Sequence, residues 1–332
     1  MKRVLLTGAN GFFGSHLLRH LLVNTNWEIV CVCSWKNKGT PERIELATKD
    51  YGMDRVTVIT HDLTAPFTDQ TKKRLGNIDY ILNIAANSHV NRSIDNPGEF
   101  ILGNTSLAYT MLELARILKP SLFLQFSTDE VYGAAAHGVN HKEWSPIIPS
   151  NPYSASKACQ EAIAISYWRT YGVPVVITNT MNLFGETQDS EKYVAQLIRK
   201  IHNNEIVTVH GIEGDIGSRY YLHARNAADA VLYIIQNLPP TLYTDGVFTP
   251  DRYNIVGDKE VDNLQLATKI AEIMGKELKY ELIDFHTGRP GHDRRYALDG
   301  HKIWELGWLA PMDFENSLQS TITWTLKHTD WL

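Results

Sequence analysis

The chain has 332 residues, 43% hydrophobic and 21% charged, so it is long and apolar enough for one large α/β domain or two subdomains that share a core. A net charge of −5 without a long basic run argues against a nucleic-acid surface, and no stretch approaches the roughly 18 apolar residues of a membrane span. The three cysteines give neither a disulfide framework nor a metal-ligand spacing, so we expect a reduced cytoplasmic protein without a metal.

The N-terminal segment has the pattern of a dinucleotide-binding loop. An apolar strand at residues 3–7 precedes three glycines spaced three residues apart, and an amphipathic helix at residues 15–23 follows them. Glycines let the backbone approach a pyrophosphate, and the free N–H groups at the start of the helix favour its charge. The same spacing occurs in ordinary turns, but its place between a strand and a helix favours a cofactor site. The predicted cofactor-binding residues here are Gly8, Asn10, Gly11, Phe12, Phe13 and Gly14.

The ends of the next two strands bear on the choice of cofactor. The strand at residues 28–33 is followed by Ser34 and Lys36, and no acidic residue stands where an NAD site usually holds the ribose 2′-hydroxyl. A hydroxyl and an ammonium suit a 2′-phosphate, so we favour NADP over NAD, with solvated loop residues as the other interpretation. After the strand at residues 56–60, Asp62 and Leu63 are expected near the adenine.

A fourth strand, at residues 80–84, leads to Ala85 and Ala86, whose small side chains let the chain pass close to the cofactor. Three polar residues follow this strand or lie within it, and they can contact ligands or simply satisfy backbone groups: Asn83, Asn87 and His89. A helix is expected at residues 104–118, and Pro120 ends it.

A fifth strand ends at Phe126 and is followed by Thr128, Asp129 and Glu130. Open α/β sheets bind ligands at such strand ends. In the helix at residues 153–171, Tyr153 and Lys157 are one turn apart and share a face. A phenol with a pKa of about 10 becomes a usable base when an ammonium and an oxidised nicotinamide, both cationic, lie beside it. Taken alone, a tyrosine and a lysine at this spacing are more often structural helix residues. Of the two acids, one can instead cap a turn while the other faces solvent.

Strands alternate with helices through residue 180, which indicates a Rossmann-type, doubly wound parallel sheet. The rhythm then changes at a turn-rich patch at residues 211–217. We expect residues 1–180, joined by a returning helix and strand at 224–257, to bind the dinucleotide. Residues 181–223 and 258–332 are expected to form a smaller, mixed substrate-binding domain.

Four motifs together resemble the extended short-chain dehydrogenase/reductase family, and within it the nucleotide-sugar 4,6-dehydratases of the dTDP-glucose type. They are the glycine loop at residues 7–14, Thr128-Asp-Glu-Val-Tyr-Gly133, Tyr153-Ser-Ala-Ser-Lys157 and the segment at residues 288–299. The acid pair discriminates most, because epimerases of this fold usually lack it. The segment at residues 34–44 is instead more similar to GDP-mannose 4,6-dehydratases, which resemble NADP users.

The resemblance implies a role for each residue of the reaction centre. Tyr153 would deprotonate the sugar 4-hydroxyl, with Lys157 tuning it and Thr128 hydrogen-bonding the same oxygen. After hydride leaves C4, Glu130 would remove the C5 proton and Asp129 would protonate the departing 6-hydroxyl. Hydride would return to C6 to give a 4-keto-6-deoxy sugar, so the NADP or NAD would be recycled and stay tightly bound.

The resemblance also implies a nucleotide-diphosphate sugar as the substrate and a homodimer or dimer of dimers, with the helices beginning near Asn104 and Tyr153 forming the interface. The nucleotide base and the sugar stay open, as do a 4-epimerase or 5,6-dehydratase on the same scaffold and a non-catalytic dinucleotide-sensing protein. The substrate-binding residues that the resemblance implies are Ser88, His89, Asn182, Arg219 and Arg294.

Overall fold

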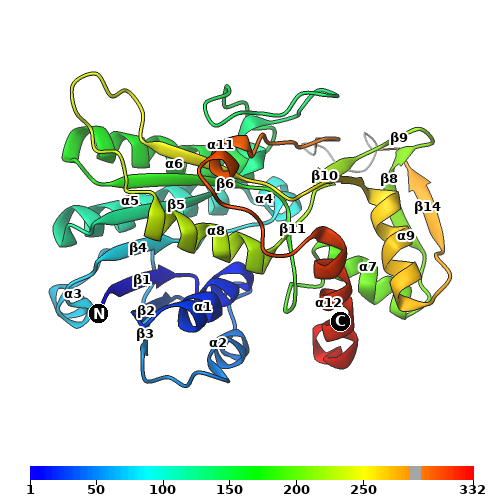
Figure 1. The fold of residues 1–332 in the computed structure, drawn as a ribbon, viewed down its shortest axis with the longest axis horizontal. Coiled ribbons are helices and arrows are strands. Elements are labelled where there is room, and N and C mark those ends of the chain that lie inside the picture. Colours follow the sequence, from blue (N-terminus) through cyan, green and yellow to red (C-terminus); the bar gives the residue numbers. More distant parts are fainter. Residues whose placement is uncertain (285–292) are drawn as a thin grey trace.

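The computed structural model describes residues 1–284 and 293–332. A seven-stranded sheet lies at its centre in the order β12-β6-β5-β4-β1-β2-β3, and every neighbouring pair is parallel (Figure 1). The predicted doubly wound parallel sheet is therefore confirmed. Its strands are β1 (Arg3–Thr7), β2 (Glu28–Cys33), β3 (Val56–Thr60), β4 (Tyr80–Asn83), β5 (Leu122–Thr128), β6 (Val175–Thr180) and β12 (Asp251–Ile255).

Helices cover both faces of this sheet, because successive residues of each buried strand point to opposite sides. In β2, Cys31 and Cys33 pack toward the helices α1 and α8, whereas Val30 and Val32 pack toward α5 and α6. Both cysteines are buried. The helices of the first face are α1 (Phe12–Asn24), α2 (Pro41–Thr48) and α8 (Ala224–Asn237), and those of the second are α3 (Asp69–Leu75), α4 (Val90–Asp95), α5 (Pro97–Leu118) and α6 (Pro152–Tyr171).

The second half of the chain adds a smaller part with its own core, at the end of the molecule where α7, α9 and α12 lie (Figure 1). A three-stranded sheet, β14-β8-β9, mixes parallel and antiparallel pairs. Its core joins α7 to α9 and α12 through residues such as Leu197, Ile270 and Leu318. The remaining elements of the second half of the chain are β7 (Leu183–Phe184), α7 (Tyr193–His202), β8 (Val207–Ile212), β9 (Asp215–Ile216), β10 (Ser218–Tyr220), β11 (Leu222–His223), β13 (Glu260–Asp262), α9 (Asn263–Met274), β14 (Tyr280–Ile283), α11 (His301–Glu305), α12 (Phe314–Lys327) and a 3₁₀ turn, η2 (Thr329–Trp331). Of these, α11 packs on the large sheet through Ile303.

Several boundaries differ from the expected ones. Helix α5 begins at Pro97 rather than at Asn104, because proline fits the first turn, where its missing N–H has no helical partner. The turn-rich patch at residues 211–217 holds the β8–β9 hairpin. The returning strand expected within residues 224–257 lies at Asp251–Ile255. Among the described helices, none combines the length and the apolar character needed to cross a membrane.

Candidate active site

A cavity of about 590 Å³ opens at the carboxyl ends of β1, β2, β4 and β5. Parallel strands place their loops at one edge of the sheet, which brings segments far apart in sequence to one site. The cavity is lined by every predicted site residue except Arg219 and Arg294. These lining residues are Gly8, Asn10, Gly11, Phe12, Phe13, Gly14, Ser34, Lys36, Asp62, Leu63, Ala85, Ala86, Ser88, His89, Thr128, Asp129, Glu130, Tyr153, Lys157 and Asn182.

The glycine loop is built for close contact. Gly8 adopts a φ of 71°, a region that favours glycine, and a Cβ at Gly14 would lie 1.9 Å from the carbonyl oxygen of Gly8. Gly11 is the N-cap of α1, and no side chain caps this helix. The first N–H groups of α1 therefore lie beside the cavity without a side chain that caps them. This arrangement suits the pyrophosphate of a dinucleotide.

At the end of β2, Lys36 lies against Asp62. Its Nζ donates to Asp62 Oδ2 at 2.7 Å, and this contact lowers the pKa of Asp62 to about 2. Both residues are expected at the cofactor, and the structure brings them together at the wall of the cavity. Lys36 is exposed enough to reach a ligand as well as its carboxylate partner.

The acid pair follows β5 in a short 3₁₀ helix, η1 (Asp129–Tyr132), which Thr128 caps. The Thr128 hydroxyl donates to Asp129 Oδ1 at 2.8 Å and accepts from the Glu130 N–H at 3.3 Å. Burial, followed by the charge of Glu130, raises the pKa of Asp129 to about 7. Burial also raises the pKa of Glu130, while a hydrogen bond from Asn151 opposes the shift. At neutral pH one acid can hold a proton while the other is ionised.

Tyr153 and Lys157 lie in the first turns of α6 and face the cavity. Burial, followed by the charges of Glu130 and Asp129, raises the pKa of Tyr153, and a hydrogen bond with the Thr128 side chain opposes that shift. Burial lowers the pKa of Lys157 to about 8. The Lys157 ammonium donates to the carbonyl oxygen of Phe126 at 2.6 Å. The tyrosine, the threonine and both acids thus interact with one another through charges and hydrogen bonds.

Arg219 and Arg294 are not brought into the lining of the cavity. The Arg219 guanidinium donates to the carbonyl oxygen of Asp293 at 2.6 Å and lies 4.4 Å from the centre of the Tyr296 ring. Its charge opposes the upward shift in the pKa of both Asp129 and Glu130, so it is close to them. Arg294 binds Asp215. Residues 288–292 of the resemblance motif lie outside the described residues.

Three further residues of the site were not predicted. Asn151 is the N-cap of α6 and donates from Nδ2 to Glu130 Oε2 at 3.2 Å. Lys192 lines the cavity and donates to the carbonyl oxygen of Ser88 at 3.2 Å. Buried Arg43 also lines it. Asn151 could be predicted from the sequence, since asparagine before proline at a helix start is a common cap. Lys192 and Arg43 instead contact distant segments, at Ser88 and Thr187.

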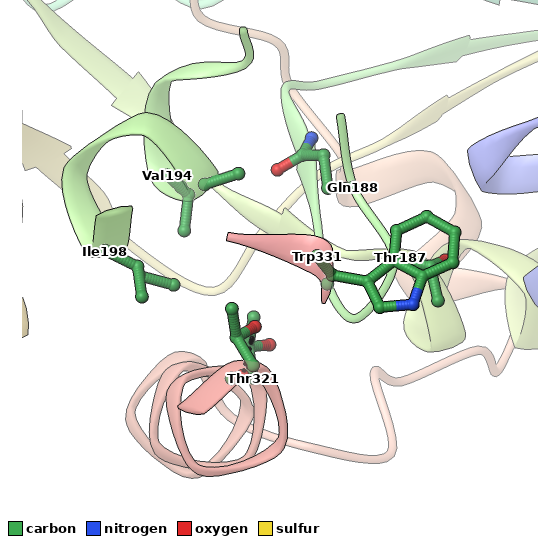
Figure 2. A pocket seen from close by; sticks show the side chains of 9 residues that line it. Thr187, Gln188, Val194, Ile198, Thr321 and Trp331 are labelled. Carbon is green, nitrogen blue, oxygen red and sulfur yellow. Dashed lines mark hydrogen bonds between the residues drawn. The ribbon is translucent and has the colours of Figure 1, made fainter. Parts of the chain in front are cut away.

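A second cavity, of about 10 Å³, lies between α7, α12 and Trp331 (Figure 2). Figure 2 shows Val194 and Ile198 of α7 facing Thr321 of α12, with Trp331 at the other side. The Arg43 guanidinium lies 5.2 Å from the centre of the Trp331 ring. A space of this size holds about one water molecule, so it is a packing void and no ligand site.

Comparison with known proteins gives consistent results over nearly the whole chain. A family model described as GDP-mannose 4,6 dehydratase matches residues 5–321. The chain is 33% identical to dTDP-glucose 4,6-dehydratase 1 of Escherichia coli K12, covering 99% of this chain and 94% of that one. The crystal structure of DesIV, a dTDP-glucose 4,6-dehydratase from Streptomyces venezuelae with NAD and TYD bound, superposes with a TM-score of 0.84 at 28% identity, covering 99% and 98% of the two chains. A UDP-glucose 4-epimerase from Thermus thermophilus, in complex with NAD, shares the fold with a TM-score of 0.83 at 23% identity, covering 97% and 98%.

Proposed function

The chain belongs to the GDP-mannose 4,6 dehydratase family, and we propose that it converts a nucleotide-diphosphate hexose to the 4-keto-6-deoxyhexose. It is an enzyme, a nucleotide-sugar 4,6-dehydratase. The observation that carries this function is the position of Asp129 and Glu130, two acids beside Tyr153 at one strand end. Epimerization at C4 needs a redox base but no acid pair, whereas loss of water needs one group to take a proton and another to give one.

The cofactor is a nicotinamide dinucleotide, held by residues 8–14 and by the start of α1. When bound, it would supply the reversible hydride chemistry that oxidation at C4 and reduction at C6 require. We propose NADP, because no acid stands at the end of β2 and because Ser34 and Lys36 line the cavity there. The Lys36 ammonium can bind a 2′-phosphate as well as the Asp62 carboxylate.

The redox half of the reaction belongs to three side chains. Tyr153 takes the proton of the sugar 4-hydroxyl at its phenolic oxygen, and Thr128 hydrogen-bonds the 4-hydroxyl oxygen of the sugar. The ammonium of Lys157, one turn along α6, favours the phenolate over the phenol. Because the two acids raise the pKa of Tyr153, proton transfer from the substrate is easiest while Asp129 is protonated.

The elimination half belongs to the acid pair. Asp129, with a pKa of about 7, carries a proton for the departing 6-hydroxyl. Glu130 takes the C5 proton, and its charged form is favoured by the Asn151 amide and by the positive charges of Arg219 and Lys192. Two carboxyl groups in sequence thus perform opposite tasks because their environments differ.

The nucleotide sugar extends from this centre toward the second half of the chain. We propose that Ser88, His89 and Asn182 contact the sugar from the cavity wall, and that Arg219 and Arg294 hold the diphosphate. Residues 1–180 with 224–257 would bind the dinucleotide, and residues 181–223 and 258–332 the nucleotide sugar.

A homodimer through α5 and α6 is also proposed. Four apolar residues of these helices can serve either an interface or the core. Met111 and Tyr167 are buried in the core, Ile163 is partly buried, and Tyr109 is 53% exposed. Leu102 and Ile117 of α5 are exposed too. Exposed apolar residues on α5, which packs against α6, suit a second copy packed as a four-helix bundle.

The test is incubation with dTDP-, UDP-, GDP- and CDP-hexoses, followed by mass spectrometry of the products. Dehydration gives a product lighter by one water with a new ketone. An unchanged mass with inverted C4 would identify an epimerase instead. Mass spectrometry of the co-purified dinucleotide distinguishes NADP from NAD independently of the substrate.

A further inference from the structure

A chain of buried side-chain amides connects the end of β1 to Lys157. It starts at Thr7, passes through Asn83 of β4 and Gln125 of β5, and reaches Gln160 of α6. All four side chains are completely buried. The links measure 3.1 Å from Thr7 Oγ1 to Asn83 Oδ1, 2.9 Å from Asn83 Nδ2 to Gln125 Oε1 and 3.2 Å from Gln125 Nε2 to Gln160 Oε1.

The direction of every link follows from the first residue. The Thr7 hydroxyl accepts from the N–H groups of Ile84 and Ala85 at 2.9 and 3.0 Å, so its oxygen has no room for a further donor and its single O–H is left to donate. Asn83 Oδ1 at 3.1 Å is the nearer acceptor of this O–H, and the carbonyl oxygen of Leu82 is the other at 3.4 Å. Asn83 must then turn its oxygen toward Thr7 and its NH₂ toward Gln125. The same requirement passes to Gln125, which presents its NH₂ to Gln160.

The last amide therefore faces Lys157 with its oxygen. Gln160 Oε1 accepts from Lys157 Nζ at 2.7 Å, while Gln160 Nε2 donates to the carbonyl oxygen of Asn104 at 2.9 Å. A flipped Gln160 would set an NH₂ against the ammonium and another oxygen against the Asn104 carbonyl. Burial makes both of these contacts costly.

We propose that Gln160 is a positioning residue that fixes the Lys157 ammonium through its side-chain oxygen, and that Thr7, Asn83 and Gln125 hold this amide in the required orientation. Lys157 then stays charged in a site whose burial disfavours charge. Glu161, on the same helix, also favours the charged form, and Tyr153 lies one turn before Lys157. Because Thr7 also binds the N–H of Ala85, the lysine and the cofactor-facing segment after β4 belong to one hydrogen-bonded unit.

The test measures the Lys157 titration directly, by NMR of protein carrying ¹³C-labelled lysine, with the Lys157→Met protein used to identify the signal. Replacing the neutral acceptor by a carboxylate in Gln160→Glu should raise the pKa of Lys157 by about one unit, and removing it in Gln160→Leu should lower it by about as much. Asn83→Leu should shift it the same way as Gln160→Leu, but less. Gln319→Leu, an exposed site on α12, should leave it unchanged.

The catalytic consequence rests on the proposed function, whereas the titration does not. The alkaline limb of the pH profile of kcat/KM should move with the NMR pKa in each variant, which a merely structural role of Gln160 would not produce. If Gln160→Leu fails to fold, the isosteric Gln160→Glu decides the question. If Gln160→Glu folds and the pKa of Lys157 in it equals that in the wild type, the proposal is overturned, even if the dehydratase activity is found.

Discussion

Asn151 performs two tasks that can be separated by mutation. Its side chain accepts from the Ser154 N–H at 2.9 Å, completing a capping box at the start of the helix that carries Tyr153 and Lys157. Its amide also donates to Glu130 Oε2 at 3.2 Å. Asn151→Ala removes both contacts, whereas Asn151→Ser keeps a capping oxygen and removes the amide donor.

The two losses have different sizes and different signatures. Loss of the cap costs about 1 kcal/mol of unfolding free energy, which corresponds to roughly 1–2 °C in Tm for a chain of this length. Loss of a hydrogen bond to the Glu130 carboxylate costs about 1.5 kcal/mol, or roughly one pKa unit. The bond favours the charged form, so its removal raises the pKa of Glu130 further. Because Glu130 acts ionised, the acid limb of kcat should move to higher pH.

The assay combines thermal denaturation with pH–rate profiles of dehydration for wild type, Asn151→Ala and Asn151→Ser. Alanine should lower Tm and shift the acid limb by about one unit. Serine should retain most of the Tm and show the same shift of the limb. A serine variant with the wild-type acid limb would refute the role of Asn151 at Glu130 and leave only the helix cap.

Three further predictions concern single groups. Tyr153→Phe should lower kcat by about 10²–10⁴-fold while the dinucleotide stays bound, and wild-type turnover would contradict its role as the base. Asp129→Asn and Glu130→Gln should block water loss more than hydride transfer, so reduced dinucleotide should accumulate in single-turnover absorbance; equal loss of both steps would argue against the division of roles. Glu161→Ala should lower the free energy of unfolding in denaturant by about 3–5 kcal/mol, because Arg252, its partner at 2.8 Å, is left buried without a carboxylate. A change near zero would contradict this and would mean that Arg252 finds another acceptor.

The sheet and most of the cavity could be predicted because their signals are local. Glycine spacing, apolar strands and the polar residues that follow Phe126 each occupy a short stretch, and parallel topology then brings the strand ends together. Helix α7, which the expected elements do not include, carries a comparable signal, because the spacing of Val194, Leu197, Ile198 and Ile201 places them on one face.

Other features depend on contacts that no local pattern contains. Arg219, which is proposed to hold the diphosphate, lies over the Tyr296 ring and donates to the carbonyl oxygen of Asp293, which is 74 positions further along the chain. Lys192 reaches the cavity wall through a contact with Ser88, 104 positions earlier. The amides of Gln125 and Gln160 look like ordinary polar residues until the packing of α6 on β5 brings them to 3.2 Å.

The central claim is that one active site oxidises C4, eliminates water across C5 and C6, and reduces C6. It is tested most directly with nucleotide-diphosphate hexoses that carry deuterium at C4. The account predicts a 4-keto-6-deoxy product with the deuterium at C6, as read by NMR and mass spectrometry. Deuterium that returns to C4 in a product that keeps its C4 hydroxyl would contradict it. A dehydrated product without deuterium at C6 would contradict it too.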